Sequence, residues 1–272
     1  SGMGHHYTYE KKMRDVRQYN RIVIKVGSAV IAQPNGKLNR EIIAAICEDI
    51  AWLLKKDKEI LIVSSGAIAL GRKKIKTSSD LSLADSQAMA AHGQIELMSA
   101  WKRQLNKFSI PIGQMLLTPR DTEIKISSQN AKQTVTKLLQ MGCLPIVNEN
   151  DSTATDEIKF GDNDLLAAKV AKLVNADLLV VLSTIDGLYT SQENMHSKKS
   201  GALVTEVSKI SAKIKKMAGD ASYMGKGGMI SKIEAAEICF KNKCVMVITS
   251  GNNKKPIRGL SKRKKSTWFI KK

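Results

Sequence analysis

The 272-residue chain contains little cysteine, few aromatic residues and no long apolar run. Its four cysteines form no CxxC pair and have no metal-binding spacing with histidine, so the sequence predicts neither a disulfide framework nor a zinc site. Reduced thiols are typical of the cytoplasm, which is the expected compartment. We find no run of about 18 apolar residues and no secretory leader, so we expect neither membrane spanning nor export.

Acidic residues are also scarce, with 25 Asp and Glu against 44 Lys and Arg and a formal charge of +19. Residues 241–272 contain eleven basic residues and no acidic one, including the run Lys262–Lys265. Such clusters favour nucleic-acid phosphates or anionic substrates such as nucleotides. No zinc finger, RNA-recognition motif or basic zipper accompanies this one, so nucleic acid is not the expected partner. We predict that Lys262–Lys265 is a solvated face.

Apolar segments alternate with amphipathic ones along most of the chain. Near-continuous apolar stretches predict buried strands at residues 21–26, 60–63, 110–112, 114–117, 144–147, 177–182 and 244–249. Helical spacing predicts helices at about residues 40–55, 84–107, 126–141, 163–175 and 229–242. This alternation predicts an α/β three-layer sandwich with a largely parallel central sheet covered by helices on both faces.

The expected organisation is a single domain over residues 20–270, since no repeat or low-complexity linker divides the chain. Residues 1–19 are expected to be a leader that is partly a cloning remnant, because it begins Ser-Gly-Met-Gly. Residues 155–159 and 188–207 are expected to form hairpins or lids beside the sheet.

Two polar clusters follow the strand predicted at residues 144–147: Asn148-Glu149-Asn150-Asp151 and Gly161-Asp162-Asn163-Asp164. Ligands of parallel sheets bind outside the carboxyl ends of the strands. Carboxylates and amides placed there suit a small polar ligand or hydrated Mg²⁺. The alternative is a pair of solvated turns.

Two other strand ends carry residues suited to anions. Lys25 lies between Ile24 and Val26 in the first strand, so its ammonium must meet an anion or reach water along its stem. Ser65 and Gly66 end the second strand, where small residues let backbone N–H groups approach an anion. Turn geometry alone is the alternative explanation for Ser65 and Gly66.

Two later segments are suited to phosphates. Residues 225–232 contain three glycines and open the last helix, which is the pattern of a phosphate cradle or of a simple loop. They match neither the P-loop nor the dinucleotide GxGxxG motif. The turn after the strand at residues 177–182 lies where a nucleotide would bind, although Asp-Gly pairs are also common in ordinary turns.

Taken in order, these segments resemble the amino-acid kinase family over about residues 21–251. The similarity lies in KVGS (25–28), SSGAI (64–68), VNEND (147–151), EIKFGDND (157–164), DGLYT (186–190) and GKGGMISK (225–232). They are most similar to members that transfer phosphate from ATP, with Mg²⁺, to the γ-carboxylate of L-glutamate. That reaction gives L-glutamyl 5-phosphate in the first step of proline biosynthesis. Members acting on acetylglutamate, aspartate or nucleoside monophosphates are the alternative.

The resemblance also implies roles for individual residues. It makes Lys25 and Lys232 catalytic, on opposite sides of the transferred phosphoryl group, with Asp164 holding both lysines. The implied substrate-binding residues are Ser65, Gly66, Asn148, Asp151, Asp162 and Asn163. The implied ATP-binding residues are Lys25, Ser183, Thr184, Lys226, Gly227, Gly228, Met229, Ile230, Ser231 and Lys232. The metal ligands stay unassigned.

The sequence departs from the family pattern in two ways. Many members have Asp where Thr184 stands, in the segment that contacts the nucleotide. Many also carry a C-terminal PUA domain of an RNA-binding type, and we expect none in this chain. The family further implies a homo-oligomer and feedback inhibition by proline.

Overall fold

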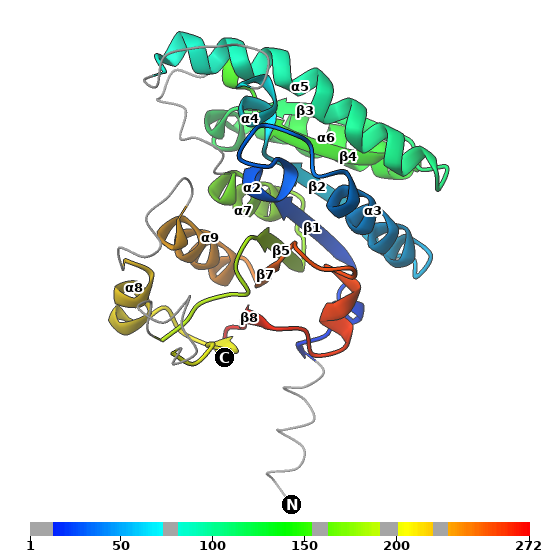
Figure 1. Ribbon diagram of the computed structural model, residues 1–272. Coiled ribbons are helices and arrows are strands. Elements are labelled where there is room, and N and C mark those ends of the chain that lie inside the picture. Colours follow the sequence, from blue (N-terminus) through cyan, green and yellow to red (C-terminus); the bar gives the residue numbers. More distant parts are fainter. Residues whose placement is uncertain (1–12, 73–80, 154–162, 191–200, 220–227) are drawn as a thin grey trace, which may run out of the picture.

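The computed structural model describes residues 13–72, 81–153, 163–190, 201–219 and 228–272. Their centre is an eight-stranded sheet with the order β3-β4-β2-β1-β5-β7-β8-β6 (Figure 1). The strands are β1 (Arg21–Val26), β2 (Glu59–Ser64), β3 (Ile112–Leu117), β4 (Leu144–Glu149), β5 (Leu178–Ser183), β6 (Glu206–Val207), β7 (Val245–Ser250) and β8 (Ser266–Phe269). Neighbouring strands run parallel, except that β7 and β8 are antiparallel.

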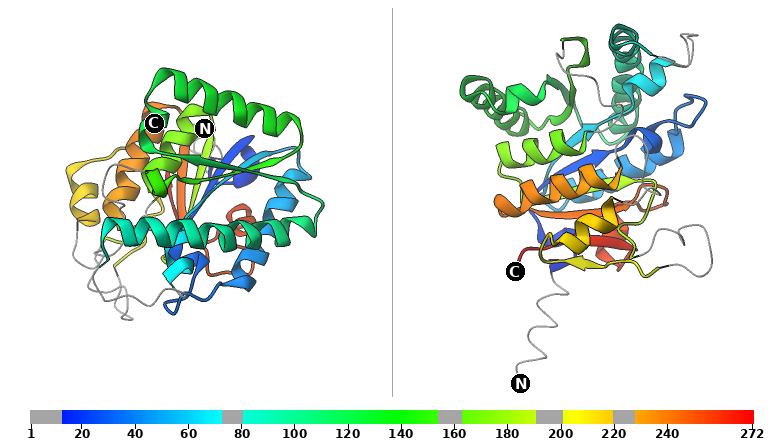
Figure 2. Two further views of the ribbon diagram at one scale, coloured as in Figure 1. Left: turned by 90° about the horizontal axis from the view of Figure 1, so that it is seen from above. Right: turned by 90° about the vertical axis from the view of Figure 1, so that its left-hand side faces the viewer.

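Helices cover both faces of this sheet. One apolar cluster joins the sheet to α2 (Ser28–Ile31), α3 (Arg40–Leu54), α4 (Ala67–Arg72) and α5 (Leu83–Asn106). The other joins it to α6 (Lys125–Gln140), α7 (Asp164–Leu173), α8 (Ala212–Ala218) and α9 (Met229–Lys241). Figure 2 shows α5 and α6 on opposite sides of the strands. The predicted three-layer α/β sandwich is therefore confirmed.

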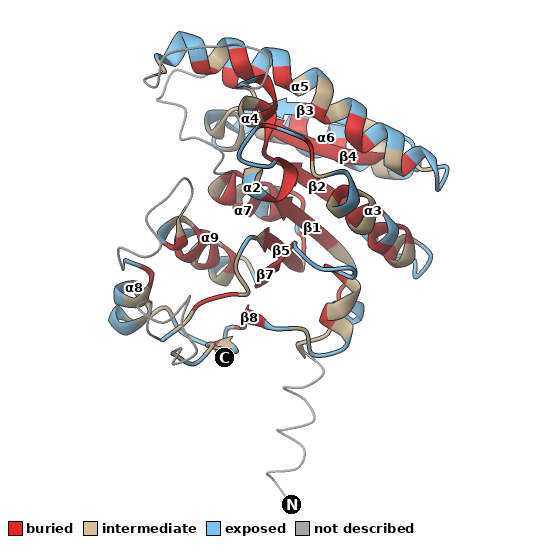
Figure 3. Ribbon diagram, in the orientation of Figure 1, coloured by how far each residue is buried: buried red, intermediate tan, exposed pale blue. Residues whose placement is uncertain are grey.

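The apolar strands are continuous because side chains on both faces are buried. In β1, Ile22 and Ile24 belong to one cluster and Val23 to the other, and all three are buried (Figure 3). Successive strand residues point to opposite faces, so a strand covered on both sides carries apolar residues on both faces. None of the described helices combines the length and apolar character needed to cross a bilayer.

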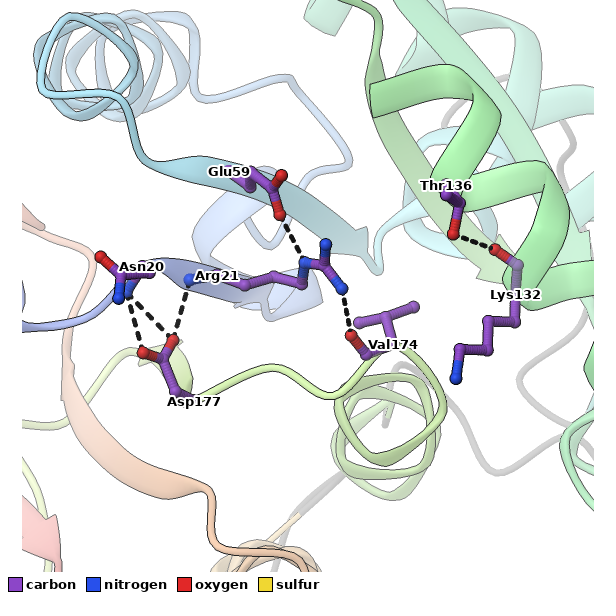
Figure 4. Close-up of polar contacts among 7 residues, drawn as sticks. All are labelled: Asn20, Arg21, Glu59, Lys132, Thr136, Val174 and Asp177. Atoms are coloured by element: carbon purple, nitrogen blue, oxygen red, sulfur yellow. Dashed lines mark hydrogen bonds and ion pairs between the residues drawn. The ribbon is translucent and has the colours of Figure 1, made fainter. Parts of the chain in front are cut away.

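The starting ends of the central strands are tied together by charged side chains (Figure 4). The Asp177 carboxylate accepts the backbone N–H groups of Asn20 and Arg21 at 2.9 and 2.8 Å. Arg21 in turn donates to Glu59 at 2.5 Å and to the Val174 carbonyl at 2.6 Å. These contacts occupy the amino-terminal ends of β1, β2 and β5. The carboxyl-terminal ends of the strands are therefore the ones left for ligands.

The segment expected to form a hairpin beside the sheet is partly described. Thr190 N–H donates to Ala202 C=O at 3.0 Å and Val204 N–H to Leu188 C=O at 2.7 Å, an antiparallel pairing as expected. Residues 206–207 instead join the sheet as β6, beside β8. The expected hairpin or lid at residues 155–159 lies outside the described residues.

Candidate active site

The carboxyl ends of β1, β2, β4 and β5 open onto one cavity of about 770 Å³. Parallel strands place these ends at the same edge of a sheet, so side chains far apart in sequence come together there. Predicted site residues that line the cavity are Lys25, Ser65, Gly66, Asn148, Asp151, Asn163, Ser183, Thr184 and Lys232. Residues that the family resemblance assigned to substrate binding and residues that it assigned to nucleotide binding therefore line the same cavity.

Two lysines and one aspartate form the charged centre of the cavity. Lys25 Nζ lies 2.8 Å from Asp164 Oδ1, and Lys232 Nζ lies 3.1 Å from Asp164 Oδ2. Ser231 Oγ donates to the same Oδ2 at 2.7 Å. Asp164 is 0% exposed, and Lys25 and Lys232 are 3% and 7% exposed. Two ammonium groups held next to one buried carboxylate suit an anionic ligand in the cavity.

Glycines allow close packing where the strands end at this cavity. Gly66 has φ +109°, and a Cβ there would lie 2.7 Å from Ile31 Cγ2, so only glycine fits without strain. A Cβ at Gly27 would lie 3.5 Å from Lys25 Nζ, in the space beside the ammonium group. Next to Gly66, Ser65 Oγ is buried and no described residue makes a hydrogen bond with it. That hydroxyl is therefore available to a ligand in the cavity.

A relay of amide side chains fixes the orientation of Asn163. Asn148 Nδ2 donates to Gln94 Oε1 at 2.7 Å, so Asn148 presents its Oδ1 to Asn163. Asn163 Nδ2 donates to that Oδ1 at 2.8 Å and to the Ser64 carbonyl at 3.4 Å. Both hydrogen bonds use the Nδ2 of Asn163 as donor. Its Oδ1, which is an acceptor, is therefore available to a ligand.

The relay begins on α5, for which the sequence predicted a helix and no part in the site. Gln94 comes from that helix, as does Trp101, whose Nε1 donates to Ser64 Oγ at 2.9 Å. Sequence reasoning missed both residues because neither is in a motif, and the partners of Gln94 are 54 residues away. It also missed Arg72 and the turn at residues 33–36, which form another wall of the cavity. Pro34-Asn35-Gly36 was the available signal, since such residues mark turns.

Asp151 adds a second acceptor to the lining of the same cavity. Burial, and then the nearby charge of Glu149, raise the pKa of Asp151 from its ordinary value of 3.8 to about 7. A cation placed near this carboxylate would oppose both effects and favour its charged form. Asp151 is therefore suited to bind an ammonium group.

The start of α9 is only partly in contact with the cavity. Gly228 precedes the helix, Met229 is 1% exposed in the core, and Ile230 is 55% exposed. None of these three residues lines the cavity, and neither does Ser231, although its hydroxyl donates to Asp164, the partner of two lysines that do line it. The predicted site residues Asp162, Lys226 and Gly227 lie outside the described residues. Within the described ranges, no group of three His, Cys, Asp or Glu side chains could hold a metal ion.

Comparison with known proteins finds a family model and relatives that match most of this chain. The model of the amino acid kinase family matches residues 20–250. Glutamate 5-kinase from Allorhizobium ampelinum is 45% identical over 259 residues, which cover 94% of this chain and 66% of the relative. Glutamate 5-kinase from Rhizobium etli is 44% identical over 254 residues, which cover 93% of this chain and 65% of the relative. The chain thus spans 65–66% of the length of these relatives.

Solved structures share the fold at much lower identity. UMP kinase from Ureaplasma parvum has a TM-score of 0.63 at 17% identity, covering 93% of this chain and 99% of that one. Carbamate kinase from Giardia lamblia has a TM-score of 0.65 at 14% identity, covering 94% of this chain and 100% of that one. The fold, the cavity at its strand ends and the family match over residues 20–250 agree: the chain belongs to the amino acid kinase family.

Proposed function

We propose that this chain transfers the γ-phosphoryl group of ATP to the γ-carboxylate of free L-glutamate. The observation that carries the proposal is the buried Lys25–Asp164–Lys232 group, which faces the same cavity as the acceptors on Asn163 and Asp151. The two lysines suit a phosphoryl group, and the acceptors on Asn163 and Asp151 suit an amine. Relatives named glutamate 5-kinase at 44–45% identity support the acceptor, and a carbamate kinase of this fold was solved with AMP-PNP bound.

The reaction needs charge stabilisation more than it needs a base. A carboxylate is already ionised and nucleophilic at neutral pH, so the obstacle is repulsion between it and the phosphates. Lys25 and Lys232 approach the transferred group from β1 and α9 and stabilise its negative charge in the transition state. Asp164 contacts both ammonium groups, which holds them at a fixed separation before the substrates bind.

Recognition of a free amino group follows from the direction of the amide relay. Asn163 offers an acceptor because its N–H groups are bound to Asn148 and Ser64. Asp151 supplies a carboxylate to the same cavity, and Ser65 Oγ is available to the substrate carboxylate. An ammonium group has three donors for such acceptors, whereas an N-acetyl group has one donor and added bulk. The site should therefore favour glutamate over N-acetylglutamate.

The cavity is compatible with Mg²⁺ held mainly by the nucleotide. Mg²⁺ keeps several water ligands and typically takes one or two carboxylates together with substrate phosphates. Glu149, a carboxylate in the described lining, would supply one such ligand. The ion, when bound, neutralises charge on the phosphates. Ser183 and Thr184, at the end of β5 and in the cavity lining, would border the nucleotide.

The test is the formation of γ-glutamyl hydroxamate, which traps the acyl phosphate product. With MgATP and hydroxylamine we expect hydroxamate from L-glutamate and almost none from N-acetylglutamate. The Lys25→Met variant serves as the control for turnover by a contaminating kinase. Equal or faster turnover of N-acetylglutamate, aspartate or carbamate would overturn the assignment of the substrate.

A further inference from the structure

Lys264 departs from the prediction that the run Lys262–Lys265 is a solvated face. Lys262, Arg263 and Lys265 are exposed, but Lys264 is half-buried. Its ammonium group donates to the backbone carbonyl of Pro256 at 2.9 Å and, through a short contact, to that of Ser250. The prediction is wrong at this position because the stem of Lys264 packs along Gly259, where a Cβ would lie 3.1 Å from Lys264 Cδ.

Burying this ammonium group carries an electrostatic cost. Burial lowers the pKa of Lys264 from 10.5 to about 8, and the charges of Asp186 and Asp49 only partly oppose that shift. No carboxylate of the described residues forms an ion pair with it. Because the pKa in the folded state lies below that of the unfolded chain, the charged lysine costs stability below about pH 8. A cation kept at such a cost points to a role other than stability.

The two carbonyls that Lys264 binds lie at the two ends of one segment, residues 250–256. Ser250 is the last residue of β7, and Pro256 comes just before Ile257. Beyond it, the buried carboxylate of Asp49 on α3 accepts the N–H groups of Ile257 and Arg258 at 2.9 and 2.7 Å. Side chains from two distant parts of the chain therefore hold this segment in place.

The same segment forms the back of the cavity wall. Gly251 N–H donates to the Ser183 carbonyl at 2.8 Å, and a Cβ at Gly251 would lie 2.6 Å from Val30 Cγ1. Ser183 and Val30 both line the cavity. A shift of Ser250 and Gly251 would therefore move Ser183, which begins the turn assigned to the nucleotide.

We propose that Lys264 is a positioning residue, which fixes residues 250–256 against Ser183 and so sets the shape of the wall that binds the nucleotide. The inference rests on the proposed function, because it takes the ligand at Ser183 to be a nucleoside triphosphate. It predicts that nucleotide affinity depends on Lys264 although the ammonium group lies behind the wall and touches no ligand.

The experiment measures binding of MgAMP-PNP to the full chain by calorimetry, without an acceptor substrate. Lys264→Met should weaken binding about tenfold, the effect of losing roughly 1.4 kcal/mol. Lys262→Met, an exposed neighbour in the same run, should bind like the unmodified chain. In the hydroxamate assay, Lys264→Met should raise the KM for ATP and leave the KM for glutamate unchanged. Its Tm should stay level or rise, which a purely structural contact would not allow.

A pH series on the unmodified chain provides a test that needs no folded variant at position 264. Between pH 7.5 and 9.5, MgAMP-PNP affinity should fall severalfold, and by less than in Lys264→Met, because the neutral amine keeps two N–H donors but loses the charge that strengthens both bonds. The Lys262→Met variant should show the same fall. Unchanged affinity in Lys264→Met, or a flat pH series, would overturn the role of Lys264. Absence of MgAMP-PNP binding by the unmodified chain would instead refute the proposed function, and this inference with it.

Discussion

At the scale of single residues, the fold gives two lysines at the cavity one shared aspartate. Asp164 has one carboxylate for two ammonium groups, so either lysine can be lost and a neutral pair still remains. Removing Asp164 would take the shared carboxylate away from two buried ammonium groups, which is much less favourable. Substituting either lysine should therefore leave folding intact, whereas substituting Asp164 should destabilise the folded state.

We expect Lys25→Met and Lys232→Met each to lower kcat for glutamate by about 10²–10³-fold, the usual loss for one preorganised electrostatic donor. The effect should fall on kcat and not only on KM, because the charge they stabilise develops in the transition state. Tm should change little, and Lys215→Met, at an exposed ion pair with Glu237, is the control. Near-normal kcat in a folded variant would contradict the assigned role.

Asp151 gives the cavity a dependence on pH near neutrality. Its carboxylate must be charged to bind an ammonium group, so the KM for glutamate should fall as pH rises from 6 to 8, through its pKa of about 7. The raised pKa means that the folded state holds this proton more tightly than the unfolded chain, so stability declines as pH rises from about 4 to about 7.

Asp151→Asn separates these two consequences. It should raise the KM for glutamate about 10–100-fold, since hydrogen bonds to charged groups contribute about 1.5–3 kcal/mol. Its Tm should exceed that of the unmodified chain at pH 8 and match it at pH 4, measured by calorimetry. An unchanged KM for glutamate in Asp151→Asn, or a lower Tm at pH 8, would contradict the role of Asp151 as a buried carboxylate that binds the substrate amine.

At the scale of elements, α5 is both a core helix and the support of the substrate site. Gln94→Leu keeps helix propensity nearly constant and leaves Asn148 Nδ2 without its acceptor. Asn148 could then rotate and release Asn163, so the KM for glutamate should rise about 5–10-fold, the cost of about one hydrogen bond. Gln104→Leu on the same helix is the matched control. Equal KM values for both variants would show that the relay does not orient Asn163.

The same elements show which parts of the fold could be predicted from sequence. β1 and β5 were predictable because strands covered on both faces carry apolar residues on both faces, and α3 because its apolar residues repeat with the helical period. The positions of Lys25 and Asp164 near the strand ends were predictable because both lie in motifs there, and their catalytic roles stay a prediction. Gln94 and Lys264 were not, because their roles depend on contacts that only the folded chain creates.

At the scale of the whole molecule, the charge of +19 sets a general attraction for anions without defining a site. Lys262, Arg263 and Lys265 are exposed and do not line the cavity. Salt screens such charges beyond a Debye length of about 8 Å at physiological ionic strength. The basic C-terminal run should therefore affect encounter with nucleotides more than their binding, with Lys264 as the exception.

Replacing the three exposed members of that run, Lys262, Arg263 and Lys265, by Gln while keeping Lys264 tests this view. At 150 mM salt, kcat and both KM values for glutamate turnover should stay within about twofold, because screened surface charges contribute little. At 20 mM salt the KM for ATP should rise modestly, since the longer Debye length restores part of the lost attraction. A large loss of kcat at 150 mM salt in the folded triple variant would mean that the run takes part in catalysis. A steep salt dependence of binding to a mixed RNA, lost in the same variant, would instead favour a nucleic-acid partner.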